Sequence, residues 1–504
     1  MPIWPDMLGK DLIYSASDPV IWNARKGNPM LDTQNRPSPV VAPLIAALRA
    51  ALGDRVHTGM AMREHHSHGE GFPAAGLPDA VAFPTSNDEV AAILRLCNAA
   101  AVPVVPFGAG TSLEGHVAAI RGGVSIDLSQ MNAILSVSPE ALDCRVQAGV
   151  TRHALNAALR SHGLFFPVDP GADATIGGMA ATRASGTRAV RYGTMRENVL
   201  GLTVVTADGR VVHTGGRARK SAAGLDLTRL FVGSEGTLGV ITEVQLRLYG
   251  LPETVVAAVC QFETLAEAAG TVIAAMQIGV PLAAIELLND VQMDACIRYS
   301  RLDEFAARPS LFLEFQGSEA ATADQIATMQ ALCDDGGGSA FRFASRPEER
   351  TRLWKARHET YYACLAYAPG KKNMGTDACV PLSEFAACIA ETEADIVASR
   401  LVAPIVGHAG DGNFHLGILH DPEDADETRR AEELARRVGE RAIRFGGTCT
   451  GEHGIGLHKR DLLEREAGDA IGLMRAIKQT LDPRHIMNPG KMLNDASRER
   501  ETAT

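Results

Sequence analysis

Residues 407–415, "GHAGDGNFH", place His408 and His415 seven positions apart around a glycine-rich stretch. On one straight strand these side chains would face opposite ways, because an odd separation alternates faces. If the chain reverses in the glycines, both imidazoles can come together at one end of a hairpin. The pattern therefore indicates either a turn that carries two structural histidines or half of a metal site.

A carboxylate that could complete such a site follows 37 residues later, in "TCTGEHGIGLHK". Glu452 and His453 lie between glycines, after a helix predicted over residues 426–447 that could return the loop to the hairpin. Two histidines and one glutamate are a common ligand set for a divalent metal. His453 is a candidate general base, since imidazole titrates near neutrality. A supporting contact or a further ligand are its alternative roles.

Three other segments, residues 106–116, 169–198 and 231–243, are rich in Gly, Ser and Thr. Glycine lets a backbone approach a ligand closely, and successive free N–H groups favour phosphate oxygens. None of the three matches a Rossmann fingerprint or a Walker loop. Any one of them could be a set of tight turns, but three together favour a large phosphate-bearing cofactor.

The chain as a whole is that of a globular protein of two or three domains, with 504 residues, 46% of them hydrophobic. A net charge of −11 argues against a nucleic-acid surface. The nine cysteines contain no C-x-x-C pair, which excludes the usual zinc-ribbon and ferredoxin spacings. No secretory signal and no apolar run of ~20 residues is found. We expect a cytoplasmic protein, with docking on a membrane surface as the alternative.

The elements that must position these residues change in rhythm near residues 251–252. Before that point, short β-rich runs alternate with turns and two helices, one over residues 86–100 with an apolar face of Val90, Ile93, Leu94 and Cys97. An Asp-Gly turn at 208–209 predicts a hairpin. After residue 254, strands alternate with helices, including one over 347–368, which indicates a sheet with helices on one face.

Several long motifs resemble, in order and spacing, the flavoprotein family of vanillyl-alcohol oxidase and p-cresol methylhydroxylase. They are "VPVVPFGAGTSLEGH", "PGADATIGGMAATRASGTRAVRYGTMRENVLGLTVVTADGRVV" and "FVGSEGTLGVITEVQLRL". Within that family the chain is most similar to FAD-linked D-lactate dehydrogenases, with D-2-hydroxyglutarate dehydrogenases and glycolate oxidase flavin subunits as neighbours.

The resemblance implies an α+β fold with a two-subdomain FAD-binding domain, a substrate domain built on an antiparallel sheet, and a C-terminal segment that contacts FAD. The expected boundaries are an arm and first helix at 1–55, the FAD domain at 56–250, the substrate domain at 251–460 and the returning segment at 461–504.

The resemblance also implies which residues hold the cofactor. Those expected to line FAD are Pro106, Gly108, Ala109, Gly110, Thr111, Ser112, Pro170, Asp173, Thr175, Gly177, Gly178, Ser185, Gly186, Tyr192, Glu235, Gly239, Ile241 and Asn488. Glu235, Gly239 and Ile241 would lie on the adenine side. Some relatives carry a histidine near Thr111 that bonds to the flavin, so Thr111 predicts non-covalent FAD, with neighbouring His116 as the remaining alternative.

For the second half, the resemblance implies that His408, His415 and Glu452 bind a divalent metal such as Zn, Mn or Fe. Arg357 would hold the substrate carboxylate through its paired donors, although Arg352 is equally basic by sequence. Asn413 would hydrogen-bond the carboxylate or the hydroxyl. The metal would stabilise the developing alkoxide while His453 takes the proton.

The sequence therefore predicts an FAD-dependent dehydrogenase that oxidises a D-2-hydroxy acid, with D-lactate first and D-2-hydroxyglutarate as the alternative. Cytochrome c, quinone and electron-transferring flavoprotein are all compatible acceptors, and a homodimer is an expectation without a specific sequence signal. Two other hypotheses remain open: that the protein is a flavin subunit that works only within an electron-transfer complex, or that it is a colourless metal hydrolase.

Overall fold

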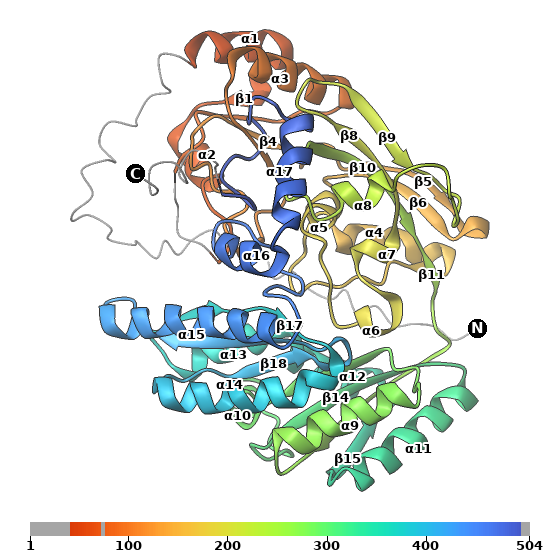
Figure 1. Cartoon of the computed structure of the whole chain (residues 1–504). Coiled ribbons are helices and arrows are strands. Elements are labelled where there is room, and N and C mark those ends of the chain that lie inside the picture. The colour runs from red at the N-terminus through yellow and green to blue at the C-terminus, as the bar shows by residue number, and fades with distance from the viewer. Residues whose placement is uncertain (1–40, 72–75, 495–504) are drawn as a thin grey trace.

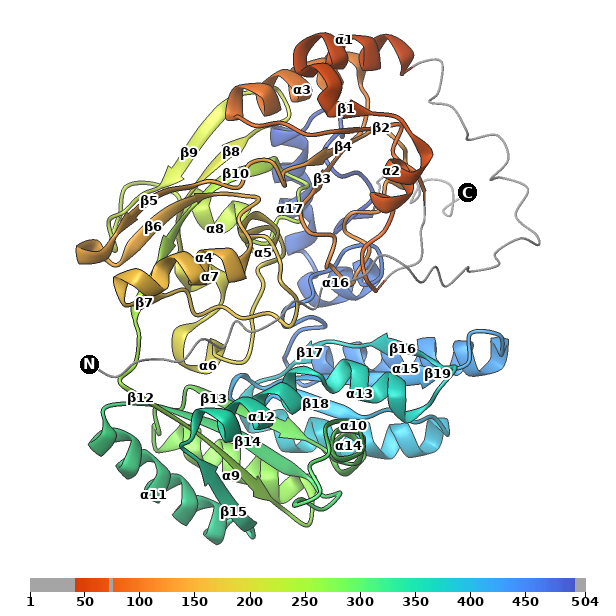
Figure 2. The same cartoon turned by 180° about the vertical axis from the view of Figure 1, so that it is seen from behind.

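The computed structural model describes residues 41–71 and 76–494, which form two lobes (Figures 1 and 2). The first lobe contains residues 41–71 and 76–250 together with the C-terminal helices, and the second contains the chain from residue 251 to the loop after residue 444. Within the described residues, no helix is both long and apolar enough to cross a membrane.

The first lobe is built on two sheets. One has the order β1-β2-β4-β3, in which β2, β4 and β3 are parallel. The other, β5-β6-β10-β8-β9, is antiparallel throughout. A short pair joins β7 to β11. The strands are β1 Val56–His57, β2 Ala80–Ala82, β3 Val104–Phe107, β4 Val124–Asp127, β5 Ile134–Ser138, β6 Asp143–Gln147, β7 Leu164–Phe165, β8 Val199–Val205, β9 Val211–Gly215, β10 Val240–Arg247 and β11 Tyr249–Gly250.

The helices of this lobe are α1 Ala42–Leu52, α2 Met60–His65, α3 Asn87–Ala100, α4 Arg152–Leu159, α5 Ile176–Thr182, α6 Ala189–Tyr192, α7 Met195–Asn198 and α8 Leu227–Phe231. Helix α3 buries the face predicted from its period, and Ser86 is its N-cap. The β8–β9 hairpin turns at Gly209, whose φ of 79° needs glycine. Both predictions are confirmed.

An acid in the first turn of α3 gives the lobe a pH-dependent element of stability. Glu89 forms a two-point ion pair with Arg55 at 2.5 and 2.6 Å, which together with Thr85 lowers the Glu89 pKa from 4.5 to about 2. Because the folded pKa is depressed, the stabilisation is present above pH 4.5 and is lost as pH falls toward 2. Because both side chains are partly exposed, we expect the ion pair to contribute about 1–2 kcal/mol to the free energy of unfolding.

Glu89→Gln is therefore expected to lower the free energy of unfolding at pH 7, and the deficit should shrink when urea titrations are repeated between pH 4.5 and 3. The exposed acid Glu140, replaced by glutamine, is the matched control. A deficit that stayed constant over this range would contradict the ion-pair explanation.

The second lobe is an antiparallel sheet of order β15-β12-β14-β13-β18-β19-β16, with β17 also paired to β19. Its strands are β12 Thr254–Gln261, β13 Ala284–Leu288, β14 Ser310–Gly317, β15 Ser339–Ala344, β16 Lys372–Gly375, β17 Ala378–Cys379, β18 Ile405–His408 and β19 Asn413–His420. The helices around it are α9 Leu265–Gln277, α10 Asp290–Ser300, α11 Glu319–Asp335, α12 Pro347–His358, α13 Thr360–Tyr367, α14 Phe385–Ser399 and α15 Ala425–Arg444.

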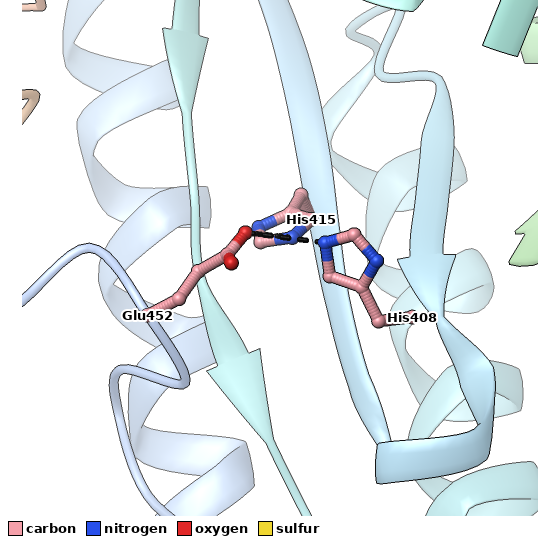
Figure 3. A group of neighbouring side chains, drawn as sticks. All are labelled: His408, His415 and Glu452. Atoms are coloured by element: carbon pink, nitrogen blue, oxygen red, sulfur yellow. Dashed lines mark hydrogen bonds and ion pairs between the residues drawn. The ribbon is translucent and has the colours of Figure 1, made fainter. Parts of the chain in front are cut away.

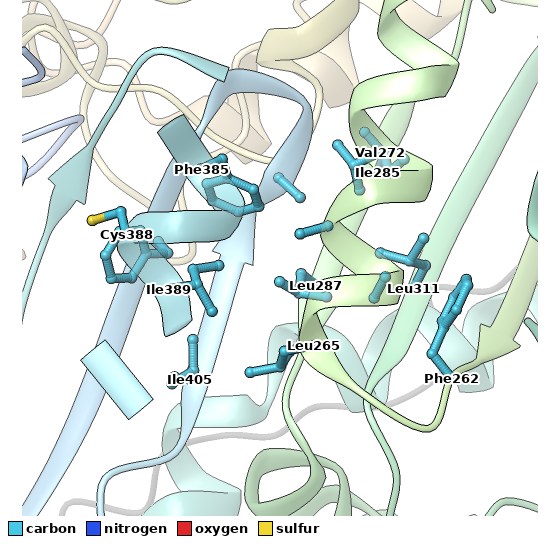
Figure 4. Close-up of a cluster of buried hydrophobic side chains, with 14 of the residues drawn as sticks. Phe262, Leu265, Val272, Ile285, Leu287, Leu311, Phe385, Cys388, Ile389 and Ile405 are labelled. Carbon is cyan, nitrogen blue, oxygen red and sulfur yellow. The ribbon is translucent and has the colours of Figure 1, made fainter. Parts of the chain in front are cut away.

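Helices cover both faces of this sheet, so the prediction of one covered face was wrong. Val256 and Ala258 of β12 face the core that contains α9, α11, α14 and α15. Figure 4 shows part of this core, with Leu265, Leu287 and Ile389 among its labelled side chains. Ala257 and Val259, which alternate with them, face a second core with α10, α12 and α13. The helix expected over 347–368 is also divided, because Glu359 leaves the helical conformation between α12 and α13.

The C-terminal segment returns to the first lobe through α16 Arg460–Ala467 and α17 Ala470–Leu481. Helix α17 ends before Asp482, and the Asp482 carboxylate accepts hydrogen bonds from the backbone of Ile486 and Met487. Met487 then lies beside Val104 of β3 in a parallel bridge. The end of the chain is thereby fixed next to the first glycine loop.

Candidate active site between the lobes

The glycine hairpin brings the two histidines onto one face. In the β18–β19 register His415 lies opposite Val406, and His408 lies two residues from Val406 on the same side of the strand. The chain reverses at Gly412, where φ is +72° and an added Cβ would lie 2.2 Å from the Val380 carbonyl oxygen. Only glycine fits that turn, and it is what allows both imidazoles to point the same way.

The Glu452 carboxylate points at both imidazoles from one side (Figure 3). Its Oε1 is 3.2 Å from Nε2 of His408 and 3.3 Å from Nε2 of His415. One donor atom from each of the three residues lies within 4.8 Å of the others, and within the described chain they are the group whose geometry could hold an ion. The donor set of two imidazoles and one carboxylate fits Zn²⁺, Mn²⁺ or Fe²⁺.

The second nitrogen of each imidazole has its own partner. Nδ1 of His408 is 2.9 Å from Oε1 of Glu286, and Nδ1 of His415 is 3.1 Å from the Thr376 carbonyl oxygen. Such contacts fix ring orientation and direct Nε2 toward a ligand. Burial lowers the pKa of His408, but Glu286 and Glu452 raise it well above the ordinary value, so a bound cation must displace a proton.

His453 lies against this group without belonging to it. Its ring stacks on that of His415, with centroids 5.1 Å apart and planes 13° from parallel. Its Nδ1 is 3.6 Å from Oε1 of Glu114. Burial lowers the pKa of His453, but the carboxylates of Asp377 and Glu114 raise it by more. The net pKa of His453 is therefore above the ordinary value. A divalent cation nearby would oppose that increase.

The structure separates the two arginines that the sequence left equivalent. Arg357 is buried and pairs with Glu286, the same carboxylate that contacts His408. Its Nε is buried and has no hydrogen-bond partner within residues 41–71 and 76–494. Arg352 instead pairs with Glu304 at the surface. Arg357 is therefore linked to the metal-ligand group through one residue, and Arg352 is not.

The amide N–H groups of Asn413 have partners within the protein. Its Nδ2 donates to Oδ1 of Asp377 at 2.7 Å and to the Ala378 carbonyl oxygen at 2.9 Å. Both amide hydrogens are therefore used within the protein, because the hairpin register turns the side chain toward β17. Its N–H groups are therefore not available to a substrate, whereas Oδ1 could still accept a hydrogen bond from the substrate hydroxyl, so that part of the expected role stays a prediction.

Asp377 is a central residue that the sequence analysis missed. Its Oδ2 accepts hydrogen bonds from the Thr450 hydroxyl at 2.7 Å and from the backbone N–H groups of Glu452 and His453 at 2.8 and 2.9 Å. Burial raises the pKa of Asp377, but the positive charges of His453 and Lys459 lower it by more. The net pKa lies below the ordinary value, so the carboxylate stays ionised. A lone aspartate in "GTDACVP" gave no motif by which to find it.

The three glycine-rich segments meet in the first lobe. A Cβ on Gly108 would lie 2.3 Å from Oγ1 of Thr175, and one on Gly236 would lie 3.0 Å from Pro106. Thr175 is the N-cap of α5. The Ser112 hydroxyl is buried without a hydrogen-bond partner in the described chain. Tightly apposed backbone with an unpaired buried hydroxyl fits a cradle for a dinucleotide cofactor.

The remaining predicted cofactor residues fall into three groups. The first group lies in the segments that form this cradle and contains Ala109, Gly110, Thr111, Pro170, Gly177, Gly178, Ser185 and Gly186. The second group lies deeper: Gly239 packs against β8, and Ile241 belongs to the hydrophobic core of this lobe.

The others make side-chain contacts elsewhere: Asp173 accepts a hydrogen bond from the His153 backbone, Tyr192 donates to Gln316 of the second lobe, and Asn488 donates to the carbonyls of His116 and Glu235.

Family models match most of the described chain. Residues 78–215 match the FAD binding domain, and residues 251–492 match the C-terminal domain of FAD linked oxidases.

Curated relatives match over nearly the whole length. A probable mitochondrial D-lactate dehydrogenase of Danio rerio is 50% identical, covering 89% of this chain and 91% of that protein. A mitochondrial D-lactate dehydrogenase [cytochrome] of Arabidopsis thaliana is 47% identical, covering 89% and 80%. The glycolate oxidase subunit GlcD of Bacillus subtilis is 37% identical, covering 85% and 91%.

Solved structures agree on the fold. A 4-ethylphenol oxidase from Gulosibacter chungangensis has a TM-score of 0.75 at 18% identity, covering 93% of this chain and 99% of that one. P-cresol methylhydroxylase has a TM-score of 0.73 at 17% identity, covering 91% and 98%. The predicted fold and family are confirmed: the chain belongs to the FAD-linked oxidoreductases of the vanillyl-alcohol oxidase and p-cresol methylhydroxylase fold, within the D-lactate dehydrogenase family.

Proposed function

We propose that this protein oxidises D-lactate to the 2-oxo acid, using non-covalent FAD and a divalent metal held by His408, His415 and Glu452. The observation that carries the proposal is the convergence of these three side chains beside His453 and the Arg357–Glu286 pair. Relatives named D-lactate dehydrogenase at up to 50% identity support the substrate.

The chain's own residues would bind and orient the acid. Arg357 keeps N–H groups beyond its bond to Glu286 and would bind the substrate carboxylate. His453 would accept the hydroxyl proton at its imidazole. When bound, FAD would supply the hydride acceptor and the metal would lower the cost of negative charge on the hydroxyl oxygen.

Flavin reduction tests the proposal directly. Under anaerobic conditions, D-lactate is expected to bleach the flavin absorbance of the isolated protein near 450 nm, whereas L-lactate should not. Prior treatment with a chelator should slow the bleaching, and Zn²⁺ or Mn²⁺ should restore it. No bleaching of the isolated chain by any 2-hydroxy acid would contradict the proposal and favour a subunit that needs partners.

The same screen separates the related substrates. One relative is named D-2-hydroxyglutarate dehydrogenase, at 33% identity, and others are named glycolate oxidase subunits. Faster bleaching by D-2-hydroxyglutarate or glycolate than by D-lactate would replace the substrate while leaving the site intact.

Electrons would then pass to a cytochrome. Three relatives carry the word cytochrome in their names, at 47%, 40% and 38% identity. Cytochrome c is thus the acceptor to test first, by its reduction in the presence of D-lactate, with a quinone and an electron-transferring flavoprotein as the comparisons. Several relatives are named mitochondrial. The cytoplasmic location and the homodimer expected from the sequence stay predictions.

A further inference from the structure

The loop that presents Glu452 and His453 is held by two buried carboxylates, one from each lobe. Asp377 of the second lobe accepts the backbone N–H groups of Glu452 and His453. Glu235 of the first lobe accepts those of Ile455 and Gly456, at 2.7 and 2.9 Å. Four of five consecutive amides in residues 452–456 are therefore directed at two carboxylates that are far apart in the sequence.

Glu235 is itself fixed from several sides. Its φ of +54° is an unusual conformation for a residue with a side chain. Its backbone N–H donates to the Ala181 carbonyl at 2.8 Å, and its carbonyl accepts a hydrogen bond from Asn488 at 2.7 Å. Its carboxylate is 3.3 Å from Nε2 of His116. The loop therefore rests on a rigid support that belongs to the first lobe.

The space between the loop at residues 452–456 and its support in the first lobe admits only glycine. A Cβ on Gly454, whose φ is +85°, would lie 2.8 Å from Oε1 of Glu235 and 2.7 Å from Nε2 of His116. Thr450 closes the loop from the other side, since its hydroxyl donates to Asp377 and accepts the Gly454 N–H at 2.9 Å. A change in the position of Glu235 would therefore be passed to this loop.

Glu235 also belongs to the cofactor cradle. The next residue, Gly236, lies against Pro106 at the start of the first glycine loop, and the amide of Glu235 donates to the Ala181 carbonyl in the last turn of α5. The residue thus connects the walls of the cradle to the loop that carries a proposed metal ligand.

We propose that Glu235 is a positioning residue that couples FAD binding to metal binding by holding the Ile455 and Gly456 amides. The inference rests on the proposed function, since it assumes the metal site at His408, His415 and Glu452. Coupling between two sites is reciprocal, so each ligand should raise the affinity for the other by the same factor. Residues that support metal ligands in this way change metal affinity or activity by about 10- to 100-fold when altered.

The test is Mn²⁺ affinity, measured by electron paramagnetic resonance on FAD-loaded protein. Glu235→Gln keeps the size of the side chain, but its amide NH₂ can no longer accept one of the two loop N–H groups. Glu235→Asp keeps the charge and withdraws the carboxylate by one methylene. At saturating FAD, we expect both variants to bind Mn²⁺ at least about 10-fold more weakly.

The matched control is Glu243→Gln. Glu243 is a buried acid of β10, eight residues from Glu235, and it pairs with Arg145 and Asn87 away from the loop. The control should bind Mn²⁺ as the wild type does. FAD affinity, followed by flavin fluorescence on dilution, should increase with Mn²⁺ in the wild type and the control, and not in Glu235→Gln.

Other outcomes overturn the inference in distinguishable ways. Wild-type Mn²⁺ affinity in both Glu235 variants would show that the loop does not depend on this carboxylate. Equal weakening in Glu243→Gln would assign the effect to general stability. If the wild type itself bound no divalent metal, the proposed function would lose its metal and the coupling with it.

Discussion

A His415→Gln protein is expected to be purified with FAD but without its metal, and to reduce its flavin with D-lactate about 1000-fold more slowly. Nε2 of His415 is one of the three converging donors, and glutamine cannot place a nitrogen of that basicity there. A metal acting on a developing negative charge is worth several kcal/mol, and ~4 kcal/mol corresponds to about 1000-fold in rate. Metal analysis and stopped-flow flavin bleaching measure the two effects.

His420→Gln is the matched control for this experiment. His420 lies on the same strand, β19, is buried, and contacts the Thr428 hydroxyl at 3.1 Å instead of the ligand group. It should keep the metal and the rate. If His415→Gln lost its metal and still reduced the flavin at the wild-type rate, the metal would be structural and the role proposed for it in oxidation would be wrong.

The hairpin with its two histidines could be predicted because its signals are local. The alternation of strand faces and the glycines at the reversal decide the orientation of His408 and His415 within nine residues. Gly412 then needs only the steric rule for positive φ. The three glycine-rich segments could likewise be assigned to cofactor binding from the sequence, since each carries its own motif.

Contacts between distant segments could not be predicted in this way. Asp377 and Glu235 hold neighbouring amides of one loop although about 140 residues separate them in the chain. Neither carries a local pattern that names its partner, because the partners are backbone N–H groups that every residue has. The place of Glu235 on the adenine side of FAD stays a prediction, and its side-chain contacts with the loop at residues 455–456 and with His116 were not expected.

Two features left a signal that the sequence analysis did not use. Glu286 stands inside the apolar run "LAAIELL", and an acid in a buried strand requires a partner. Its partners are Arg357 and His408. The run "TVVAAVCQF" is apolar at both alternating positions, which is typical of a strand covered on both faces. That pattern indicates the two helical layers that the structure shows.

Arg357→Lys is expected to lower kcat/KM for D-lactate by about 100-fold, mainly through a higher KM. Guanidinium offers parallel donors to a carboxylate, whereas the lysine ammonium is a point charge on a flexible stem. Losing hydrogen bonds between charged groups costs about 1.5–3 kcal/mol, which corresponds to one to two decades. Steady-state kinetics at saturating acceptor measures the change. Arg352→Lys, on the same helix but paired with Glu304 at the surface, should leave both constants unchanged.

Lysine is the informative replacement because of Glu286. That carboxylate is fully buried and contacts both Arg357 and Nδ1 of His408, so an uncharged residue at 357 would leave it without its cation. Such a loss costs about 3–5 kcal/mol of stability and would disturb the metal ligand as well. With lysine, metal content and melting temperature should stay near those of the wild type while KM rises. A fall in metal content together with an unchanged KM would instead mean that Arg357 serves Glu286 and His408, and that another group binds the substrate carboxylate.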